Sequence, residues 1–288
     1  MAAPHIDMRG KTVMVTGFTA GLGRASAFAL AAMGADVVGV CRNAEKGQRV
    51  LDEIGRANGS AKLDMLVGDM GVQQDVRRVA DRFLASDRPL HALYNNAGVF
   101  NLSRTTTEDG YETTFAVNHL GYFLLTNLLL EWLCRTGAAR VVCTASDGYK
   151  FCGRLDFDDL QAEKKYSAFL VYCRSKLANI LFARELGRRE ASRGLTAHSF
   201  HPGFVGSDFA KNNGRFARFA TTMISPFARS SQKGGETGVY LCTAPEVREG
   251  NGGYFYDMKP RKLASNARHP EDAARLWEVS LELTGLSA

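Results

Sequence analysis

TVMVTGFTAGLG, residues 12–23, decides the fold, because a strand pattern leads directly into a loop with three glycines. An alanine-rich helix is expected next, over residues 24–33. Glycines let a backbone approach a pyrophosphate closely, and a helix N-terminus offers unpaired N–H groups and the positive end of a dipole. The G-x-x-x-G-x-G spacing differs from the common G-x-G-x-x-G fingerprint, and a plain turn is the alternative. We interpret the loop as a phosphate-binding site made by Gly17, Thr19, Ala20, Gly21, Leu22 and Gly23.

Strand and helix patterns alternate along the chain, and this alternation predicts an α/β fold with a parallel sheet. We expect one domain over residues 1–288, because no linker-like composition divides it. The expected architecture is a Rossmann-type doubly wound sheet of about seven parallel strands with helices on both faces. Strands are expected at residues 12–16, 36–40, 62–67, 90–94, 140–146, 195–200 and 253–256, and further helices at 44–57, 72–86, 108–133, around 172, at 235–242 and at 271–284.

Composition limits the classes of protein to which the chain can belong. Of 288 residues, 45% are hydrophobic and 23% are charged, which is typical of a globular domain. The six cysteines form no C-x-x-C pair and have no histidines at zinc-ligand spacing, so neither a metal site nor a disulfide framework is expected. The net charge of +6 comes from basic residues scattered among acidic ones, so no nucleic-acid partner is expected.

Hydropathy predicts neither a signal peptide nor an integral membrane segment. Residues 1–11 carry charges but no apolar run. The apolar stretch 120–130 is too short to cross about 30 Å of hydrocarbon and is interrupted by Thr126 and Asn127, so we expect a buried helix there. Together with the unpaired cysteines, these patterns favour a cytoplasmic protein.

Residues suited to a nucleotide follow the second and third strands. In dinucleotide folds an acidic residue about 20 positions past the loop binds the ribose 2′-hydroxyl, whereas an arginine accommodates a 2′-phosphate. Here Cys41 and Arg42 follow the second strand, so we predict NADP(H); an arginine that merely ends a strand in water is the alternative. Asp69 and Met70 follow the third strand, where the carboxylate could accept from an adenine amino group.

The fourth and sixth strands end in small or rigid residues that favour close contact with a cofactor. Asn95, Ala97 and Gly98 lie at the end of the fourth strand, with a tight turn as the alternative. After the sixth strand, proline fixes a turn and glycine permits close approach at Pro202 and Gly203. We add these five residues to the expected cofactor contacts.

Tyr172 and Lys176 lie four residues apart in a segment that reads as helix, so their side chains share one face. A phenol alone is a poor acid-base group at neutral pH, because its reference pKa is ~10. A nearby ammonium favours the phenolate, and the shifted phenol can exchange protons near pH 7. A packed tyrosine beside a solvated lysine is the ordinary alternative for an isolated Y-x-x-x-K.

Two other polar residues are candidates for the same site. Asn118 lies within the helix expected at 108–133, where asparagine is a weak helix former and costly to bury without partners. A structural and a catalytic reason for Asn118 both stay open at this point. Ser146 ends the fifth strand, whereas His119 and His201 are interpreted as structural residues.

Apolar residues at helical spacing recur between residues 207 and 233, with arginines among them. Their position after the last cofactor loop predicts a lid, residues 204–232, over an apolar substrate. An amphipathic face resting on membrane lipid is the second interpretation. The residues concerned are Phe209, Phe216, Phe219, Met223 and Phe227.

In their order and spacing, these motifs resemble the short-chain dehydrogenase/reductase family over essentially the whole chain. The long interval after Ser146 with Phe157-Asp-Asp-Leu160, together with Cys41-Arg42, resembles the retinol-dehydrogenase branch. So does Arg275-Leu-Trp277, although Ala145 replaces a second serine that is usual there. The family motifs are Thr16-Gly17-x3-Gly21-x-Gly23, Asn95-Asn96-Ala97-Gly98, Asn118, Ser146, Tyr172-x3-Lys176 and Pro202-Gly203.

The resemblance implies a role for each motif residue. Tyr172 is expected to donate a proton to the nascent alkoxide in reduction, or to take one in oxidation. Lys176 would lower the pKa of the phenol and hold the nicotinamide ribose. Ser146 would orient the substrate oxygen, and Asn118 would hold a water that relays protons to Lys176. Residues 202–205 would border the nicotinamide, with Val205 as a cofactor contact and Phe204 beside the substrate.

The sequence thus predicts an NADP(H)-dependent oxidoreductase acting on a ketone, aldehyde or secondary alcohol of a fairly apolar small molecule. A retinoid-like or steroid-like alcohol is the alternative substrate. A catalytically silent NADP-binding sensor or scaffold is the alternative class, but such relatives commonly lose the tyrosine or lysine. Family members often pair through long helices, so a homodimer or homotetramer is also expected from the resemblance.

Overall fold

The computed structural model describes residues 6–59, 61–205, 229–248 and 250–287. Its sheet has the strand order β3-β2-β1-β4-β5-β6-β7-β8, and all pairs are parallel except β7 with β8. The expected doubly wound parallel sheet is therefore confirmed, with one short antiparallel strand added at an edge. The strands are β1 Thr12–Thr16, β2 Asp36–Cys41, β3 Leu63–Val67, β4 Ala92–Asn95, β5 Arg140–Thr144, β6 Thr196–His201, β7 Tyr254–Tyr256 and β8 Lys259–Pro260.

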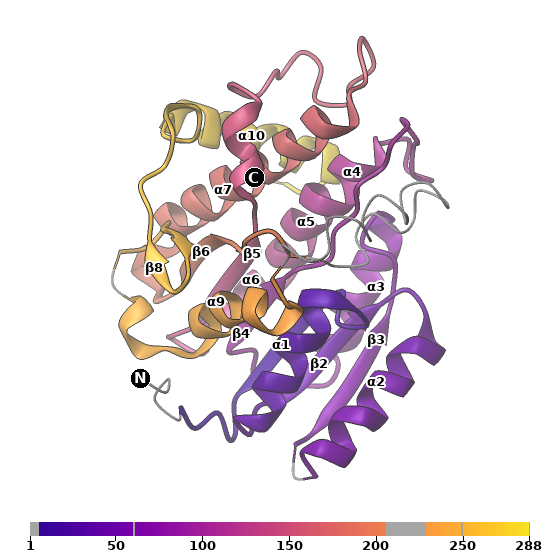
Figure 1. Ribbon diagram of the computed structural model, residues 1–288, viewed down its shortest axis with the longest axis vertical. Helices are drawn as coiled ribbons and strands as arrows, with labels where there is room; N and C mark the ends of the chain where they lie inside the picture. Colours follow the sequence, from indigo (N-terminus) through magenta and orange to yellow (C-terminus); the bar gives the residue numbers. More distant parts are fainter. Residues whose placement is uncertain (1–5, 60, 206–228, 249, 288) are drawn as a thin grey trace.

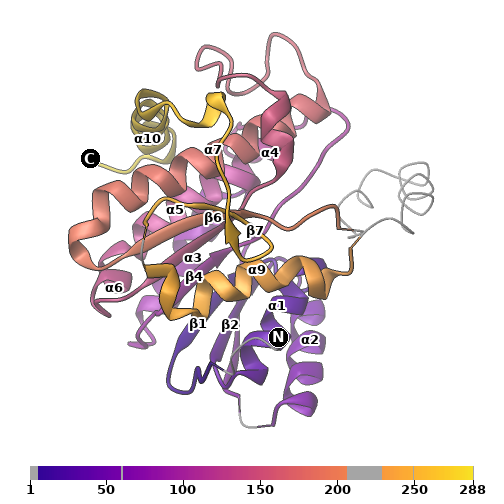
Figure 2. The same cartoon turned by 60° about the vertical axis from the view of Figure 1, so that its left-hand side comes forward.

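Helices cover both faces of the sheet, which Figure 2 shows lying between two helical layers. One layer holds α1 (Gly21–Ala32), α2 (Ala44–Ala57) and α9 (Ser231–Thr243). The opposite layer holds α3 (Gln73–Leu84), α5 (Gly121–Leu128) and α7 (Ala168–Glu190), against which α10 (Pro270–Thr284) packs (Figure 1). The two faces alternate along each strand.

The alternation is visible in β1, whose residues feed two separate cores. Val13 and Val15 pack with residues of α1 and α2, whereas Met14 packs with residues of α3 and α5 on the other face. All five residues of β1 are buried. A fully buried strand of this kind is typical of a parallel sheet covered on both sides. Because β1, β2, β4, β5 and β6 are parallel, their carboxyl ends lie at the same end of the sheet.

The helix expected at residues 108–133 differs from the structure. Residues Thr107–Gly110 form a turn, and Glu112 caps a later start by accepting from the N–H groups of Thr114 and Phe115. The helical path then comprises α4 (Thr113–Phe115), a π-helical turn (Ala116–Leu120), α5 (Gly121–Leu128) and α6 (Leu130–Cys134). The hydrophobic pattern could not predict the π-turn, because a π-turn adds one residue to a helical turn without changing the composition.

The lid expected at 204–232 lies largely outside the described residues. Its two ends are described, and they meet: Val205 and Arg229 form a β-bridge, and the N–H of Arg229 donates to the carbonyl of Phe204 at 2.8 Å. Within the described part of the chain, no helix combines the length and apolarity needed to cross a bilayer.

Candidate active site

Hydrogen bonds between β1 and the segment after β4 hold the glycine loop. The hydroxyl oxygen of Thr16 accepts from the backbone N–H groups of Asn96 (2.9 Å) and Ala97 (3.0 Å). The Asn96 amide donates to the Thr16 carbonyl at 2.9 Å. A Cβ on Gly17, which has φ +70°, would lie 2.9 Å from the Ala97 Cα, so only glycine fits there. The loop and the Asn95–Gly98 segment are therefore neighbours, as their expected roles require.

The N-terminus of α1 is open to an anion. Its N-cap residue, Ala20, makes no side-chain hydrogen bond to the first turn, and that turn contains no acidic residue. A Cβ on Gly23 would lie 2.4 Å from the carbonyl oxygen of Gly17 and 2.5 Å from the amide nitrogen of Asn96, which shows how tightly the loop turns into the helix. Free N–H groups and the helix dipole favour negative charge at this point. These residues therefore fit the phosphates of a dinucleotide.

Arg42 lies at the open end of β2. Its side chain is 60% exposed and its guanidinium lies 3.4 Å from a carboxylate oxygen of Asp69. An exposed pair at this distance contributes little to stability, so the guanidinium is available to another anion. Arg24, beside the loop, pairs with Glu53 instead. The side chain of Met70 packs in the core, so that residue can reach a cofactor only through its backbone.

Tyr172, Lys176 and Ser146 converge where β5 ends and α7 passes it. The Lys176 ammonium lies 5.5 Å from the centre of the Tyr172 ring and donates to the Thr144 carbonyl at 3.1 Å. Ser146 caps the short helix that follows β5, because its hydroxyl oxygen accepts from the N–H of Gly148 at 3.1 Å. Tyr172 is half-buried, whereas only 2% of Lys176 is exposed. The structure thus brings the three side chains together.

Burial is the largest influence on the pKa values of both Tyr172 and Lys176. Burial raises the pKa of Tyr172 to about 12, although a hydrogen bond with Ser146 opposes the rise. Burial also lowers the pKa of Lys176 to about 7. Loss of hydration therefore moves the phenol pKa in the direction opposite to the expected effect of the ammonium, and that effect stays a prediction. Negative charge placed near Lys176 would raise its pKa again and favour the ammonium form.

Asn118 is fully buried in the π-turn and joins three segments. Its side-chain oxygen accepts from the N–H of Val99 at 2.8 Å, and its amide donates to the carbonyl of Val99 at 3.1 Å and to the hydroxyl of Ser175 at 3.0 Å. The Ser175 hydroxyl in turn donates to the carbonyl of Tyr172 at 2.8 Å. Asn118 therefore fixes the loop after β4 against the helix turn that carries Tyr172 and Lys176.

Comparisons with known proteins agree with this arrangement. The family model described as short chain dehydrogenase matches residues 11–217. The chain belongs to the short-chain dehydrogenase family. It is 39% identical to retinol dehydrogenase 12 of Mus musculus over 98% of this chain and 89% of that protein. It is 40% identical to retinol dehydrogenase 11 of Homo sapiens over 98% of this chain and 88% of that protein. The retinol-dehydrogenase-like character expected from the sequence is thereby confirmed.

Solved structures show the same fold. A crystal structure of an uncharacterized protein from Mycobacterium paratuberculosis has a TM-score of 0.79 and 28% identity, and it covers 98% of this chain and 96% of its own. A short chain dehydrogenase from Burkholderia cenocepacia, solved in complex with NADP, has a TM-score of 0.67 and 27% identity, with 86% of this chain and 96% of that chain covered.

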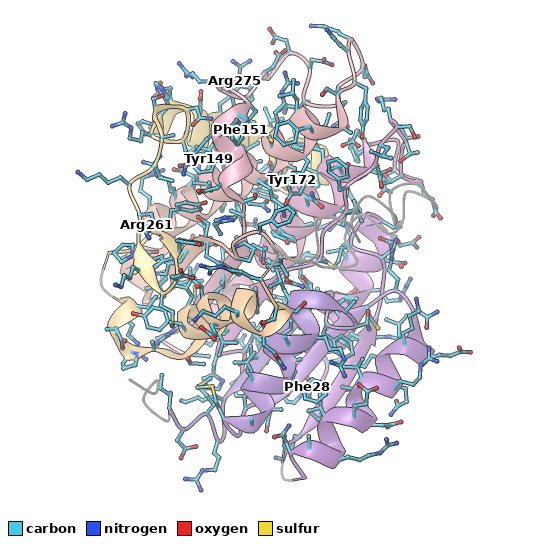
Figure 3. The ribbon with its side chains drawn as sticks, viewed as in Figure 1. Phe28, Tyr149, Phe151, Tyr172, Arg261 and Arg275 are labelled. Carbon is cyan, nitrogen blue, oxygen red and sulfur yellow. The ribbon has the colours of Figure 1, made fainter. Side chains whose placement is uncertain are left out.

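One aromatic side chain contacts Tyr172, and several other apolar side chains of this short-chain dehydrogenase are exposed. Phe100 contacts the Tyr172 ring edge-on at 5.7 Å between centroids, and Phe151 contacts Phe169 at 5.8 Å. Phe151 and Tyr172 are both labelled in Figure 3. Phe151 is 67% exposed and Phe169 is 51% exposed, which is unusual for aromatic residues. Leu102, Leu170 and Phe204 are also exposed. We call Leu102, Phe151, Phe169, Leu170 and Phe204 the apolar rim.

Some expected site residues of the dehydrogenase have other contacts. The side chain of Asn95 is buried and donates to the hydroxyl of Thr126 at 3.0 Å, so it is engaged inside the protein. Gly98 follows Ala97 in the same crevice, and Pro202 and Gly203 lie at the end of β6, with Gly203 at φ +85°. Their contacts with a cofactor remain predictions. Val205 joins Arg229 in the β-bridge described above.

Asn179 was missed by sequence reasoning, and Thr16 and Asn96 were named only as parts of motifs, without a role. Asn96 ties the glycine loop, Thr16 receives the two N–H groups of the next loop, and the amide of Asn179 donates to the Thr144 carbonyl at 3.1 Å, beside Lys176. Asn179 lies one turn beyond Lys176 on α7, and this helical spacing was the available signal. The hydrogen-bond partners of Asn96 and Thr16 are distant in sequence, so no local pattern could identify those bonds.

Proposed function

We propose that this short-chain dehydrogenase transfers hydride between NADP(H) and a ketone, aldehyde or secondary alcohol, with Tyr172 as the acid or base. The convergence of Tyr172, Lys176 and Ser146, at the same end of the sheet as the uncapped start of α1, supports this proposal. The nicotinamide would supply or accept the hydride, while the chain positions the reactants and handles the proton.

Each side chain has a defined task in this proposal. Ser146 donates a hydrogen bond to the substrate oxygen and keeps it beside the phenol. Tyr172 gives its proton to the oxygen in reduction and recovers one from Lys176, whose pKa of about 7 lets it exchange protons near neutrality. In its charged form Lys176 also stabilises the phenolate. Asn118 holds the turn that carries this pair, and the expected water relay would start from that turn.

The cofactor preference follows from the charge at the end of β2. A 2′-phosphate placed there would meet the exposed guanidinium of Arg42, and the preceding Cys41 offers no carboxylate for a 2′-hydroxyl. Asp69 lies opposite Arg42 and is suited to the adenine amino group. The loop residues 17–23 would bind the pyrophosphate, and Ala97, Gly98, Pro202, Gly203 and Val205 would line the rest of the crevice.

The apolar rim supports an apolar substrate. Phe169 and Leu170 are exposed on the same helix as Tyr172, and exposed apolar side chains of this kind suit the uptake of an apolar molecule. The retinol dehydrogenases among the relatives agree with a retinoid-like alcohol, and a steroid-like alcohol has similar surface and volume. Residues 204–232 are proposed as a lid over this substrate. A cytoplasmic location and a homodimer or homotetramer remain predictions.

Turnover of NADPH with a panel of apolar aldehydes and ketones tests the proposal. The wild type should consume NADPH, and Tyr172→Phe should lower kcat by at least about 100-fold, the scale expected for loss of a general acid. Tyr240→Phe, which removes a phenol from α9 on the opposite sheet face, is the matched control and should retain activity. Equal turnover by Tyr172→Phe and wild type would refute the role of the phenol. Tight NADPH binding without turnover by the wild type would favour the silent sensor.

A further inference from the structure

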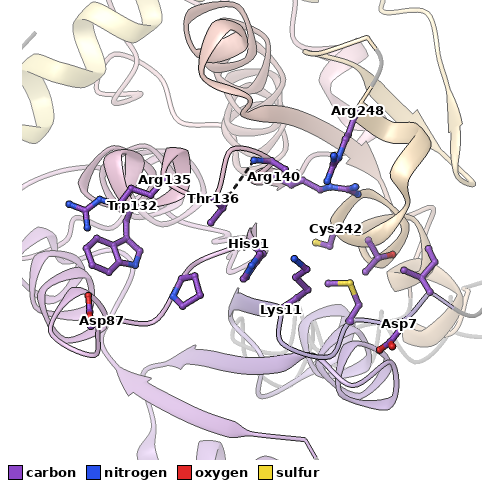
Figure 4. A pocket seen from close by; sticks show the side chains of 15 residues that line it. Asp7, Lys11, Asp87, His91, Trp132, Arg135, Thr136, Arg140, Cys242 and Arg248 are labelled. Atoms are coloured by element: carbon purple, nitrogen blue, oxygen red, sulfur yellow. Dashed lines mark hydrogen bonds between the residues drawn. The ribbon is translucent and has the colours of Figure 1, made fainter.

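A cavity lies at the amino ends of the strands, at the opposite end of the sheet from Tyr172, Lys176 and Ser146. It has a volume of about 420 Å³ and is lined at the amino ends of three strands by Lys11 before β1, His91 before β4 and Arg140 at the start of β5. Arg248 and Trp132 form its walls (Figure 4). We call this cavity the basal pocket. At ~3.3 Å per residue, β5 places Arg140 roughly 20 Å from Ser146.

The lining of the basal pocket carries more cationic than acidic side chains. Among the described residues, none of Lys11, Arg140 and Arg248 has an acidic side chain within ion-pair distance. Of the two aspartates in the lining, Asp7 pairs with Arg9 outside it, and Asp87 lies toward Trp132 (Figure 4). The cations that face the basal pocket repel one another, and a bound anion between them would replace this repulsion with attraction.

Arg140 is the strongest sign that an anion belongs there. Only 6% of the residue is exposed, and among the described residues its side chain donates only to the carbonyl of Leu241, at 3.2 Å. Burial lowers the pKa of Arg140 and the charge of Arg248 adds to that effect, whereas Cys242 and Glu246 oppose it. A guanidinium has five N–H donors, and one carbonyl cannot satisfy them. A buried arginine is normally paired or hydrogen-bonded more completely than this.

The remaining lining supplies donors and one aromatic surface. The Nδ1 atom of His91 accepts from the N–H of Thr12 at 3.0 Å, so the neutral ring carries its proton on Nε2 and can donate it. Trp132 is held in place because its indole N–H donates to the Arg88 carbonyl and the Arg135 guanidinium stacks on it at 4.2 Å. The pocket thus offers cationic donors at one end and a rigid apolar wall at the other.

We propose that the basal pocket binds a phosphate group carried by a small organic molecule. Phosphate has several acceptor oxygens and two charges, which suit a guanidinium and an ammonium that converge from different strands. A cavity of about 420 Å³ exceeds the needs of phosphate alone, so the organic part would lie against Trp132. The phosphate could belong to a soluble metabolite or to a phospholipid headgroup, because the recognised chemistry is the same. This site is separate from the nucleotide crevice and does not depend on the proposed reaction.

Titration calorimetry with inorganic pyrophosphate tests the site, with excess NADP+ present to fill the nucleotide crevice. The wild type should bind one pyrophosphate, and the double variant Lys11→Ala/Arg248→Ala should bind it at least about tenfold more weakly. Both residues are exposed, so the variant should fold, and its melting temperature verifies this. Arg82→Ala removes an exposed charge from α3 and is the matched control, which should bind like wild type.

Vesicles distinguish the two sources of phosphate. Cosedimentation is measured with phosphatidic acid vesicles and with phosphatidylcholine vesicles for wild type, the double variant and Arg82→Ala. Pyrophosphate binding that the double variant loses supports a soluble ligand. Binding to phosphatidic acid that only the double variant loses, without pyrophosphate binding, supports a headgroup. If neither ligand binds, or if the double variant and Arg82→Ala lose binding equally, the proposal is overturned.

Discussion

Replacement of Lys176 by methionine should stabilise this protein while inactivating it. Methionine keeps the length of the side chain but carries no charge. In the protein alone, burial lowers the pKa of Lys176 from 10.5 to about 7. Each unit is worth ~1.4 kcal/mol, so keeping this ammonium buried costs the folded state on the order of 5 kcal/mol at low pH. The carbonyl of Thr144 would not become unsatisfied, because it also accepts from Asn179.

The sign of the effect follows from proton binding in the two states. Below pH 7 the lysine is protonated in both the folded and the unfolded chain, and the full cost is present. Between pH 7 and 10.5 the unfolded chain binds more protons than the folded chain, so the stability of the wild type rises with pH across this range. The stability advantage of Lys176→Met should therefore be about 3 to 5 kcal/mol near pH 6 and should shrink toward zero above pH 10.

Urea unfolding without nucleotide, followed by circular dichroism from pH 6 to 10, measures this difference. Lys46→Met, on the exposed face of α2, is the matched control and should change the free energy of unfolding by less than about 0.5 kcal/mol at every pH. A pH-independent difference between Lys176→Met and wild type would refute the reasoning, because it would show that the buried ammonium carries no titrating cost.

Three other substitutions have defined outcomes. Asn118→Ala leaves the backbone of Val99 unpaired inside the protein, so urea unfolding should show a free energy of unfolding lower by about 2 to 5 kcal/mol. The control Asn127→Ala removes one half-buried hydrogen bond and should lower it by less than about 1 kcal/mol. Equal losses for the two variants would contradict the role of Asn118 in holding the loop at Val99. Gly23→Ala should weaken NADPH binding at least about tenfold by fluorescence titration, because the Cβ would meet the Gly17 carbonyl; unchanged binding would remove the loop from the site. Arg42→Ala should weaken NADPH binding much more than NADH binding in the same titration, and equal loss of both would exclude a 2′-phosphate contact.

Much of the fold was predictable because local patterns and tertiary packing agree. The helix expected at 44–57 has those bounds in the structure, since Asn43 caps it and accepts from the N–H of Lys46 at 2.8 Å. The helix expected at 108–133 disagreed, because Glu112 caps a later start and the chain then forms a π-turn around Asn118. The strand β8 has only two exposed residues, so it left no hydrophobic pattern to detect.

The sequence alone determined the order of strands and helices and the chemical identity of the catalytic candidates. Strand and helix periodicity are local, and Tyr172 with Lys176 share a face by helical spacing. Only the tertiary structure decided how these groups behave. The pKa of Lys176 depends on burial between β5 and α7, and Asn118 holds residues from other segments. The basal pocket exists because the amino ends of β1, β4 and β5 become neighbours once the sheet assembles, and that adjacency is a property of strand order rather than of local sequence.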